Sequence, residues 1–122
     1  ARVSTPATWA EKTASAISAV LLGGQGPGVD TVAGSLAVGS RTLQTKLKQE
    51  GTTYRRLLDK VRRELAAAFL ERADLALYDV AFLLGFAEQS AWNNAFKRWT
   101  GMTPNEFRRR HAPAGSGDLD RQ

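Results

Sequence analysis

Short amide, hydroxyl and guanidinium side chains gather in two stretches of the sequence. They are Arg41, Thr42, Gln44 and Thr45 in the first stretch, and Gln89, Ser90, Asn93 and Asn94 in the second, GFAEQSAWNNAFKRW at 85–99. Such side chains present paired donors and acceptors, the chemistry that reads the edges of nucleic-acid bases. Adjacent asparagines are poor helix formers, because their amides compete for backbone hydrogen bonds. Their place in mid-helix therefore calls for a reason other than helix stability.

The rest of the sequence offers no catalytic or metal-binding set. Cysteine is absent, which excludes disulfides, thiolate zinc sites and thiol nucleophiles. The single histidine, His111, has no partner ligands, and no carboxylate pair or nucleophile–base set stands out. The glycine-rich stretch GGQGPG at 23–28 lacks the lysine and the following helix motif of a P-loop. We therefore expect no enzyme activity, no metal and no cofactor.

Charge points to a polyanionic partner. The chain of 122 residues, enough for one small domain, has 17 Lys and Arg against 12 Asp and Glu. The excess lies between Ser40 and His111, where 14 basic residues stand against 8 acidic ones. A basic domain of this size most often binds nucleic acid. A solvated charged surface on an ordinary helical protein is the alternative.

Several features bear on location. No apolar run approaches the roughly 18 residues that a membrane span needs, and no secretory signal is visible. The absence of cysteine suits a reducing cytoplasm. We therefore expect a cytoplasmic protein with no membrane contact. Because the chain starts at Ala1 without a methionine, we also expect it to be part of a longer protein.

Helical periodicity runs through the sequence, and no stretch alternates as a strand does, so the predicted fold class is all-α. We expect about seven helices, at 8–22, 31–38, 40–50, 53–72, 78–84, 88–100 and 103–111. In the longest helix the predicted apolar stripe is Tyr54, Leu57, Leu58, Val61, Leu65, Ala68 and Phe69. Its basic residues, Arg62 among them, are expected off that stripe. Trp92, Ala95, Phe96 and Trp99 form a similar stripe, whose spacing favours core packing over stacking on bases.

An internal repeat relates the two halves of the chain. At one constant offset, Val32, Ala33, Leu36 and Val38 recur as Val80, Ala81, Leu84 and Phe86; after a single inserted residue, Leu43, Leu47 and Lys48 recur as Trp92, Phe96 and Lys97. Each copy reads as a short helix, a turn, and a second helix with apolar anchors and a polar outer face. That is the helix-turn-helix pattern, whose second helix enters the DNA major groove. Two helical hairpins packed without a ligand are the alternative.

The repeat divides the chain into five parts. We expect a tail at 1–7, a first helix-turn-helix subdomain at 8–52, a linking helix at 53–72, a second subdomain at 73–111 and a disordered tail at 112–122. A linking helix of about 20 residues spans roughly 30 Å. Successive major grooves on one face of B-DNA lie about 34 Å apart, which is compatible with two recognition helices one turn apart.

The motifs resemble the DNA-binding domain of AraC/XylS-type transcriptional regulators, over about Thr8 to His111. The resemblance is carried by VAFLLGF at 80–86, QS at 89–90, AFKR at 95–98, GMTP at 101–104 and FRR at 107–109, with RTLQ at 41–44, GTTY at 51–54 and VRR at 61–63 upstream. It implies a bacterial, cytoplasmic transcription regulator, nucleoid-associated when bound, whose recognition helices at about 40–50 and 88–100 read adjacent major-groove segments of a promoter. It further implies an effector-binding or dimerisation domain missing from this chain, and RNA polymerase as a partner of the full protein.

Residue roles follow from chemistry and resemblance together. The base-reading candidates are the eight residues of the two polar stretches, with the resemblance itself pointing to Arg41, Gln44 and Thr45 in the first. The phosphate candidates are Lys48, Arg55, Arg56, Arg63 and Lys97. Relatives commonly carry Arg at Thr45 and Asn94, and Ser at the caps where this chain has Gly39 and Ala87, although Ser40 can cap one residue later. The alternative function is a basic helical protein-interaction or dimerisation module without sequence-specific DNA binding.

Overall fold

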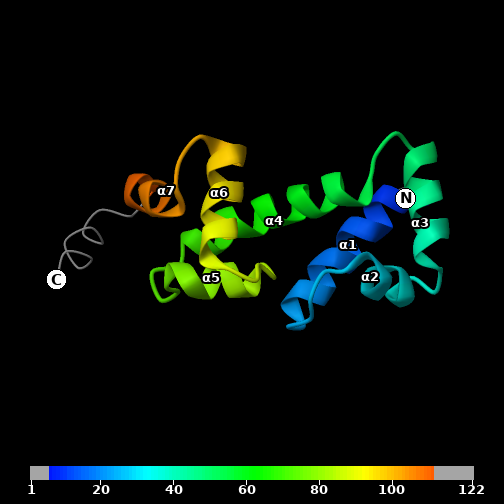
Figure 1. Cartoon of the computed structure of the whole chain (residues 1–122), viewed down its shortest axis with the longest axis horizontal. Helices are drawn as coiled ribbons and strands as arrows, with labels where there is room; N and C mark the ends of the chain where they lie inside the picture. The colour runs from blue at the N-terminus through cyan, green and yellow to red at the C-terminus, as the bar shows by residue number, and fades with distance from the viewer. Residues whose placement is uncertain (1–5, 112–122) are drawn as a thin grey trace, which may run out of the picture. The chain divides into compact units, whose positions relative to one another are not determined.

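The structure, a computed structural model, describes residues 6–111, and within that range it contains seven α-helices and no strand (Figure 1). The helices are α1 (Trp9–Leu22), α2 (Val29–Ser35), α3 (Ser40–Gln49), α4 (Tyr54–Leu70), α5 (Leu77–Leu83), α6 (Gln89–Thr100) and α7 (Pro104–His111). The all-α prediction is confirmed. The predicted tail at 112–122, and all but the last two residues of that at 1–7, lie outside the described residues.

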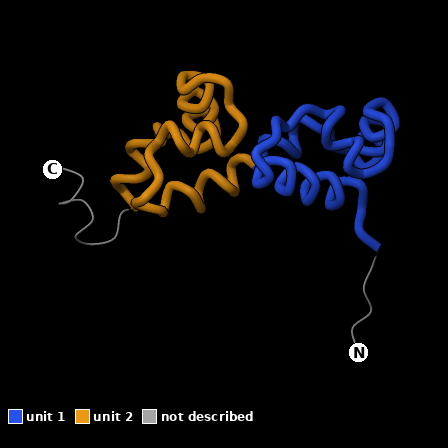
Figure 2. Tube along the Cα trace, turned by 90° about the horizontal axis from the view of Figure 1, so that it is seen from below, with its two compact units in different colours: residues 1–61 blue, residues 62–122 orange. Residues whose placement is uncertain are grey.

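The chain forms two compact units, residues 1–61 and residues 62–122 (Figure 2). In unit 1, α1, α2 and α3 contact one another in all three pairs; in unit 2, α6 contacts both α5 and α7. Helix α4 contributes its first part to unit 1 and the remainder to unit 2. Each unit thus holds one copy of the repeat, and the five-part division of the chain remains a prediction.

Unit 1 is built on fully buried aliphatic side chains from three helices. Ile17 of α1, Val32 of α2, and Leu43 and Leu47 of α3 are all 0% exposed. Helix α1 begins with a capping box, in which the Thr8 hydroxyl accepts from the Glu11 N–H at 3.0 Å and the Glu11 carboxylate accepts from the Thr8 N–H at 2.8 Å. The periodic positions of the sequence therefore place the core of this unit correctly.

The turn before α3 differs from the prediction. Helix α2 ends at Ser35 rather than Val38. The turn is made by Ala37, which has φ 60, the left-handed region. Its counterpart in the second copy of the repeat is Gly85, with φ 78. The repeat therefore extends to the backbone conformation, although one copy has a side chain where left-handed φ favours glycine.

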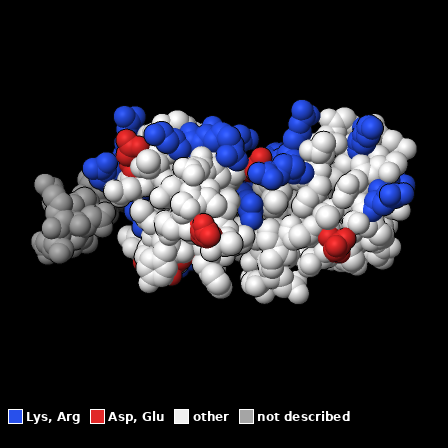
Figure 3. All heavy atoms as spheres, viewed as in Figure 1, with Lys and Arg blue, Asp and Glu red and all other residues white. Residues whose placement is uncertain are grey.

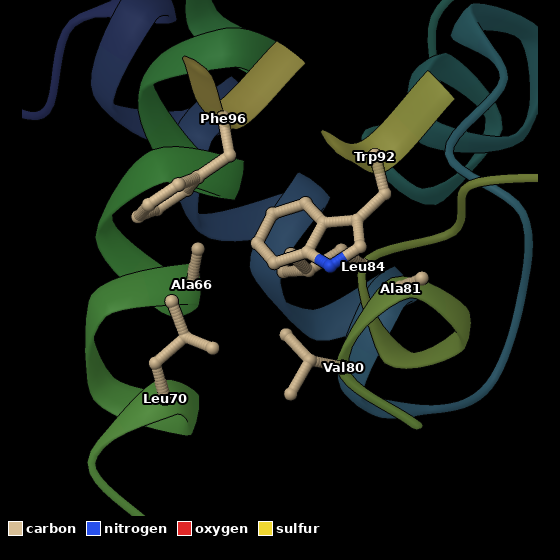
Figure 4. Close-up of a cluster of buried hydrophobic side chains, with 7 residues drawn as sticks. All are labelled: Ala66, Leu70, Val80, Ala81, Leu84, Trp92 and Phe96. Carbon is tan, nitrogen blue, oxygen red and sulfur yellow. The ribbon is translucent and has the colours of Figure 1, made fainter. Parts of the chain in front are cut away.

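Unit 2 has a core centred on two aromatic rings (Figure 4). Trp92 and Phe96 lie with centroids 5.2 Å apart, and they pack with aliphatic side chains of α4 and α5. The cluster is completed by Ala66, Leu70, Val80, Ala81 and Leu84. The predicted stripe of α4 is wrong in its last turns, because Ala66 and Leu70 are buried whereas Ala68 is exposed. In this part of α4 the buried residues follow the spacing i, i+4 from Ala66, which brings them beneath the rings.

Candidate nucleic-acid interface

The first polar stretch lies on α3, the second helix of the first repeat. Its apolar side, Leu43 and Leu47, is completely buried. The five residues predicted to contact DNA from this helix are all exposed: Arg41, Thr42, Gln44, Thr45 and Lys48. The spacing of Arg41, Gln44, Thr45 and Lys48 places them on one outer face. Exposure of that face is a condition for base contact, and the role of each residue remains a prediction.

A carboxylate holds the end of this helix against the start of α1. Glu50, the C-cap residue of α3, accepts hydrogen bonds from the backbone N–H groups of Trp9 and Ala10, each at 2.8 Å. The first-turn amides of α1 would otherwise lack partners, and they favour a negative charge. The Lys46 ammonium also lies 5.2 Å from the Trp9 ring centroid. These contacts fix α3 within unit 1, and no local sequence signal reveals them because the partners lie far apart in the chain.

The second polar stretch lies on α6, which is held by aromatic anchors. Trp92, Ala95 and Phe96 are buried and Trp99 is half-buried, which confirms the core role predicted for this stripe. On the other side Gln89, Ser90, Asn94 and Lys97 are exposed, while Asn93 is half-buried. Asn93 therefore lies nearer the core than the sequence predicts. Its neighbour Asn94 is exposed, as contact with a base edge requires.

The side-chain amides predicted to read bases make no hydrogen bonds within the described part of the protein. Within residues 6–111, no hydrogen bond uses the side chains of Gln44, Gln89, Asn93 or Asn94. Ser90 is the exception among the polar candidates of α6, since its hydroxyl lies 3.5 Å from the Glu88 carboxylate, a long contact. Free amides on a rigid helix keep both donor and acceptor available for a partner, as bidentate contact to adenine requires.

Arg62 links α4 to the turn that leads into α6. Its Nε donates to the Leu84 carbonyl at 2.8 Å, and its Nη2 donates to the Gly85 carbonyl at 3.0 Å. The guanidinium also lies 4.1 Å from the centroid of the Phe86 ring, which in turn contacts Trp92 and Trp99. The sequence predicts Arg62 only as a residue off the apolar stripe, whereas in the structure it is half-buried and bonded to the backbone. Its spacing of four from Leu58 and from Ala66 was the available signal.

The N-termini of the two recognition helices carry no side-chain cap. The N-cap residues are Gly39 and Glu88, and neither makes a side-chain hydrogen bond to its helix. The cap position predicted at Gly39 is therefore confirmed, whereas the alternative cap at Ser40 and the cap predicted at Ala87 are wrong, because Ser40 lies inside α3 and Ala87 precedes the cap of α6. Gly39 and Glu88 hold equivalent places in the two copies, so the inserted residue of the second copy lies before Glu88. The first N–H groups of both helices thus lack side-chain partners at the ends nearest the polar stretches.

Exposed cations accompany both helices. Arg55, Arg56 and Arg63 on α4, with Lys48 on α3 and Lys97 on α6, are all exposed, as phosphate contact requires. Arg55 lies 3.7 Å from Asp59, an i,i+4 pair on the surface that holds it weakly. In Figure 3, Lys and Arg gather along the upper edge of unit 2, over α6, while the lower edge over α5 is mainly uncharged.

The described residues carry neither a metal-binding cluster nor a membrane helix. Between residues 6 and 111, no three His, Cys, Asp or Glu side chains are grouped as ligands. No helix in that range is both long enough and apolar enough to cross a bilayer.

Comparison with known proteins places this geometry in a family. A family model described as a helix-turn-helix domain, of the AraC type, matches residues 32–110, well over half of the chain. The ornithine utilization regulator of Pseudomonas aeruginosa is 40% identical over 85 residues, which cover 70% of this chain and 25% of that protein. This chain spans about a quarter of the length of the curated relatives that it matches.

Two solved structures share the fold. The transcriptional regulator CdpR from Pseudomonas aeruginosa superposes with a TM-score of 0.68 at 38% identity, covering 80% of this chain and 31% of that one. A DNA-binding transcriptional dual regulator from Escherichia coli K-12 gives a TM-score of 0.79 over 90% of this chain and 97% of that one, at 22% identity. The matched model, the paired helix-turn-helix units and these relatives agree: the chain belongs to the AraC/XylS family and is a helix-turn-helix DNA-binding domain of transcription regulators.

Proposed function

We propose that this domain reads a specific promoter sequence through two helices, α3 and α6, each in its own major-groove segment, the two segments being adjacent on the duplex. The observation that carries the proposal is that each helix presents free polar side chains outward while its apolar side is locked in a core. A rigid helix with unpaired amides meets the geometric demand of direct readout. A surface that bound acidic proteins by charge alone would need no amides at these positions.

Roles are assigned by chemistry and exposure. Arg41, Thr42, Gln44 and Thr45 on α3, and Gln89, Ser90, Asn93 and Asn94 on α6, contact bases. Of the two asparagines, Asn93 is half-buried and Asn94 is exposed, so Asn94 is the stronger candidate. Lys48, Arg55, Arg56, Arg63 and Lys97 contact phosphates, which position the helices without selecting a sequence.

The domain works within a longer regulator. The relatives are about four times the length of the matched region, which supports a further effector-binding or dimerisation domain in the full protein. We place that protein in the bacterial cytoplasm, at the nucleoid when bound, with RNA polymerase as its partner at the promoter. The alternative, a protein-interaction module without DNA specificity, is not favoured by the family.

Selection of bound duplexes from a random pool tests the proposal. The whole chain is incubated with the pool, and bound duplexes are recovered and sequenced over several rounds. We expect two enriched blocks of bases, with centres about one helical turn apart. A single enriched block would show that only one of the two helices reads bases, which contradicts the proposal. Recovery of duplexes with no enriched sequence would remove specific readout altogether.

A further inference from the structure

A groove of about 660 Å³ opens in unit 1 beside the first reading helix. Its walls come from the loop before α2, from the outer face of α3 and from the first turns of α4. The residues that line it include Val29, Gln44, Lys48, Tyr54, Arg55 and Leu58. Small-molecule sites commonly have volumes of about 300 to 1,000 Å³, so the size suits a small organic ligand.

The floor of the groove is apolar and fixed in place. Leu58 is 9% exposed, and Val29 and Tyr54 are only partly covered. The Tyr54 hydroxyl donates to the Pro27 carbonyl at 2.6 Å, which ties its side chain to the loop before α2. A preformed apolar floor of this kind favours a ligand with an aromatic or aliphatic body.

The rim of the groove is cationic. Lys48 and Arg55 are exposed, and none of the residues that line the groove is acidic. Lys48 makes no ion pair within the described residues, and the Arg55–Asp59 contact is long and open to solvent. The Gln44 amide adds a donor and an acceptor at the same rim. The charge is therefore complementary to an anion, with a donor beside it to orient the charged group.

We propose that this groove binds a small amphipathic anion, one apolar ring system or chain carrying a single carboxylate or sulfonate. A bare phosphate would use the rim and leave the floor unfilled, so the floor argues for an organic body. The bound anion covers Gln44 and Lys48, and it therefore competes with DNA. Binding of the anion stands by itself; only the competition rests on the proposed function.

A matched pair of fluorescent probes tests the binding step. The anion 8-anilinonaphthalene-1-sulfonate and neutral N-phenyl-1-naphthylamine share one aromatic body and differ in the sulfonate. Titrated into the folded chain, the anion should bind once per chain and at least about tenfold more tightly, the weight of one charge-assisted hydrogen bond. Equal affinity for the two probes, or binding of several anions per chain, would overturn the proposal.

Variants locate the site. Lys48→Met and Arg55→Met should each lower the affinity for the anionic probe about tenfold and leave the affinity for the neutral probe unchanged, because only the charge is removed. Val29→Trp should lower the affinity for both probes, because the larger side chain fills the apolar part of the groove. Lys60→Met removes an exposed cation that does not line the groove and should change neither affinity. Thermal melting of each variant confirms that it is folded. Equal loss in Lys60→Met and Lys48→Met would mean general attraction to a basic surface and would overturn the site.

Competition tests the regulatory step. The selected duplex is added to the chain loaded with the anionic probe, and probe fluorescence is followed. We expect displacement with the affinity of the duplex itself. A duplex that binds without displacing the probe would overturn the competition but leave the proposed function intact. Failure to bind any duplex, with the probe still bound, would sink the proposed function alone.

Discussion

Gln44 and Asn94 are the side chains whose base-reading roles are most open to test, one on each recognition helix. Both amides are exposed and free of partners within the described residues. Substitution of either by alanine should relax preference at one base position, with a cost of about 1 to 3 kcal/mol if the contact is bidentate. Competition binding against duplexes changed at single positions measures this directly.

Each of these variants has a matched control of the same chemistry. Gln25 lies in the loop between α1 and α2 and Asn105 lies on α7, and both are exposed amides outside the predicted reading faces. Gln25→Ala and Asn105→Ala should leave base preference unchanged. If Gln44→Ala or Asn94→Ala weakened all duplexes uniformly, the residue would belong with the phosphate contacts instead.

Ala37 is a single residue under backbone strain. Its φ of 60 places a Cβ in the left-handed region, which costs roughly 1 to 2 kcal/mol relative to glycine. The gain from removing this strain is partly offset, because glycine has more conformational freedom in the unfolded chain and loses more of it on folding. Ala37→Gly should therefore raise the free energy of unfolding by about 0.5 to 1 kcal/mol, seen as a higher urea midpoint. An unchanged or lower midpoint would show that the turn carries no such strain.

At the residue scale, sequence patterns identify anchors better than partners. Leu43, Leu47, Trp92 and Phe96 were placed correctly, because helical spacing alone identifies an apolar stripe. The role of Arg62 was missed, because nothing local in the sequence identifies the Leu84 and Gly85 carbonyls that accept its hydrogen bonds. The departures at Thr45 and Asn94 are visible in the sequence, and their effect on base preference remains a prediction.

At the element scale, the orientation of α6 depends on the turn that precedes it. Arg62 binds two carbonyls of that turn and stacks on Phe86. Arg62→Lys keeps the charge but loses the paired donors and the planar stacking surface. It should lower duplex affinity by about 1 to 3 kcal/mol and relax preference only in the block read by α6. The salt dependence should stay unchanged, because Arg62 contacts no phosphate.

Arg63 provides the control for this variant. It is the next residue along α4 and is exposed. Arg63→Met should weaken all duplexes alike and reduce the salt slope by about 1, as loss of one phosphate contact requires. A purely structural role for Arg62 would lower the melting temperature of Arg62→Lys without changing base preference in either block, and that result would contradict the positioning role.

Helix α7 begins with a capping box like that of α1: the Thr103 N–H donates to the Glu106 carboxylate at 2.9 Å, and the Thr103 hydroxyl accepts from the Glu106 N–H at 3.1 Å. These two boxes make helix stability depend on acid pH. The Thr103 N–H and, secondarily, its hydroxyl lower the pKa of Glu106, and Thr8 lowers the pKa of Glu11 in the same way. A carboxylate with a lowered folded pKa stabilises the fold above its unfolded pKa, and that contribution is lost as pH falls through the folded pKa. Glu106→Gln should therefore flatten the fall in melting temperature below about pH 4.5. An unchanged acid limb would contradict this role.

Element existence was predictable, whereas element ends were not. The prediction placed α2 at 31–38, but the helix runs over Val29–Ser35, because the chain leaves it through left-handed Ala37 rather than at a glycine. The prediction started α4 at Thr53, whereas the helix begins at Tyr54. The Thr53 hydroxyl precedes the helix and accepts a hydrogen bond from the Arg56 N–H in its first turn. The residues at which a helix begins and ends depend on backbone geometry, which the turn propensities of single residues do not determine.

For the whole molecule, the repeat was the most informative feature of the sequence. It predicted two units of one plan with differently sized anchors, Leu43 and Leu47 in one and Trp92 and Phe96 in the other. The long-range Glu50 contact to Trp9 and the groove beside α3 required the structure, because both join residues far apart in the chain.

Salt dependence of binding, measured on the selected duplex and on a scrambled duplex of the same composition, tests the central claim most directly. With five phosphate contacts, the logarithm of the association constant should fall with log salt at a slope of about −4.5 for the selected duplex. The selected duplex should also bind at least about a thousandfold more tightly than the scrambled one at physiological salt. A slope near zero, or equal affinity for the two duplexes, would contradict sequence-specific readout by α3 and α6.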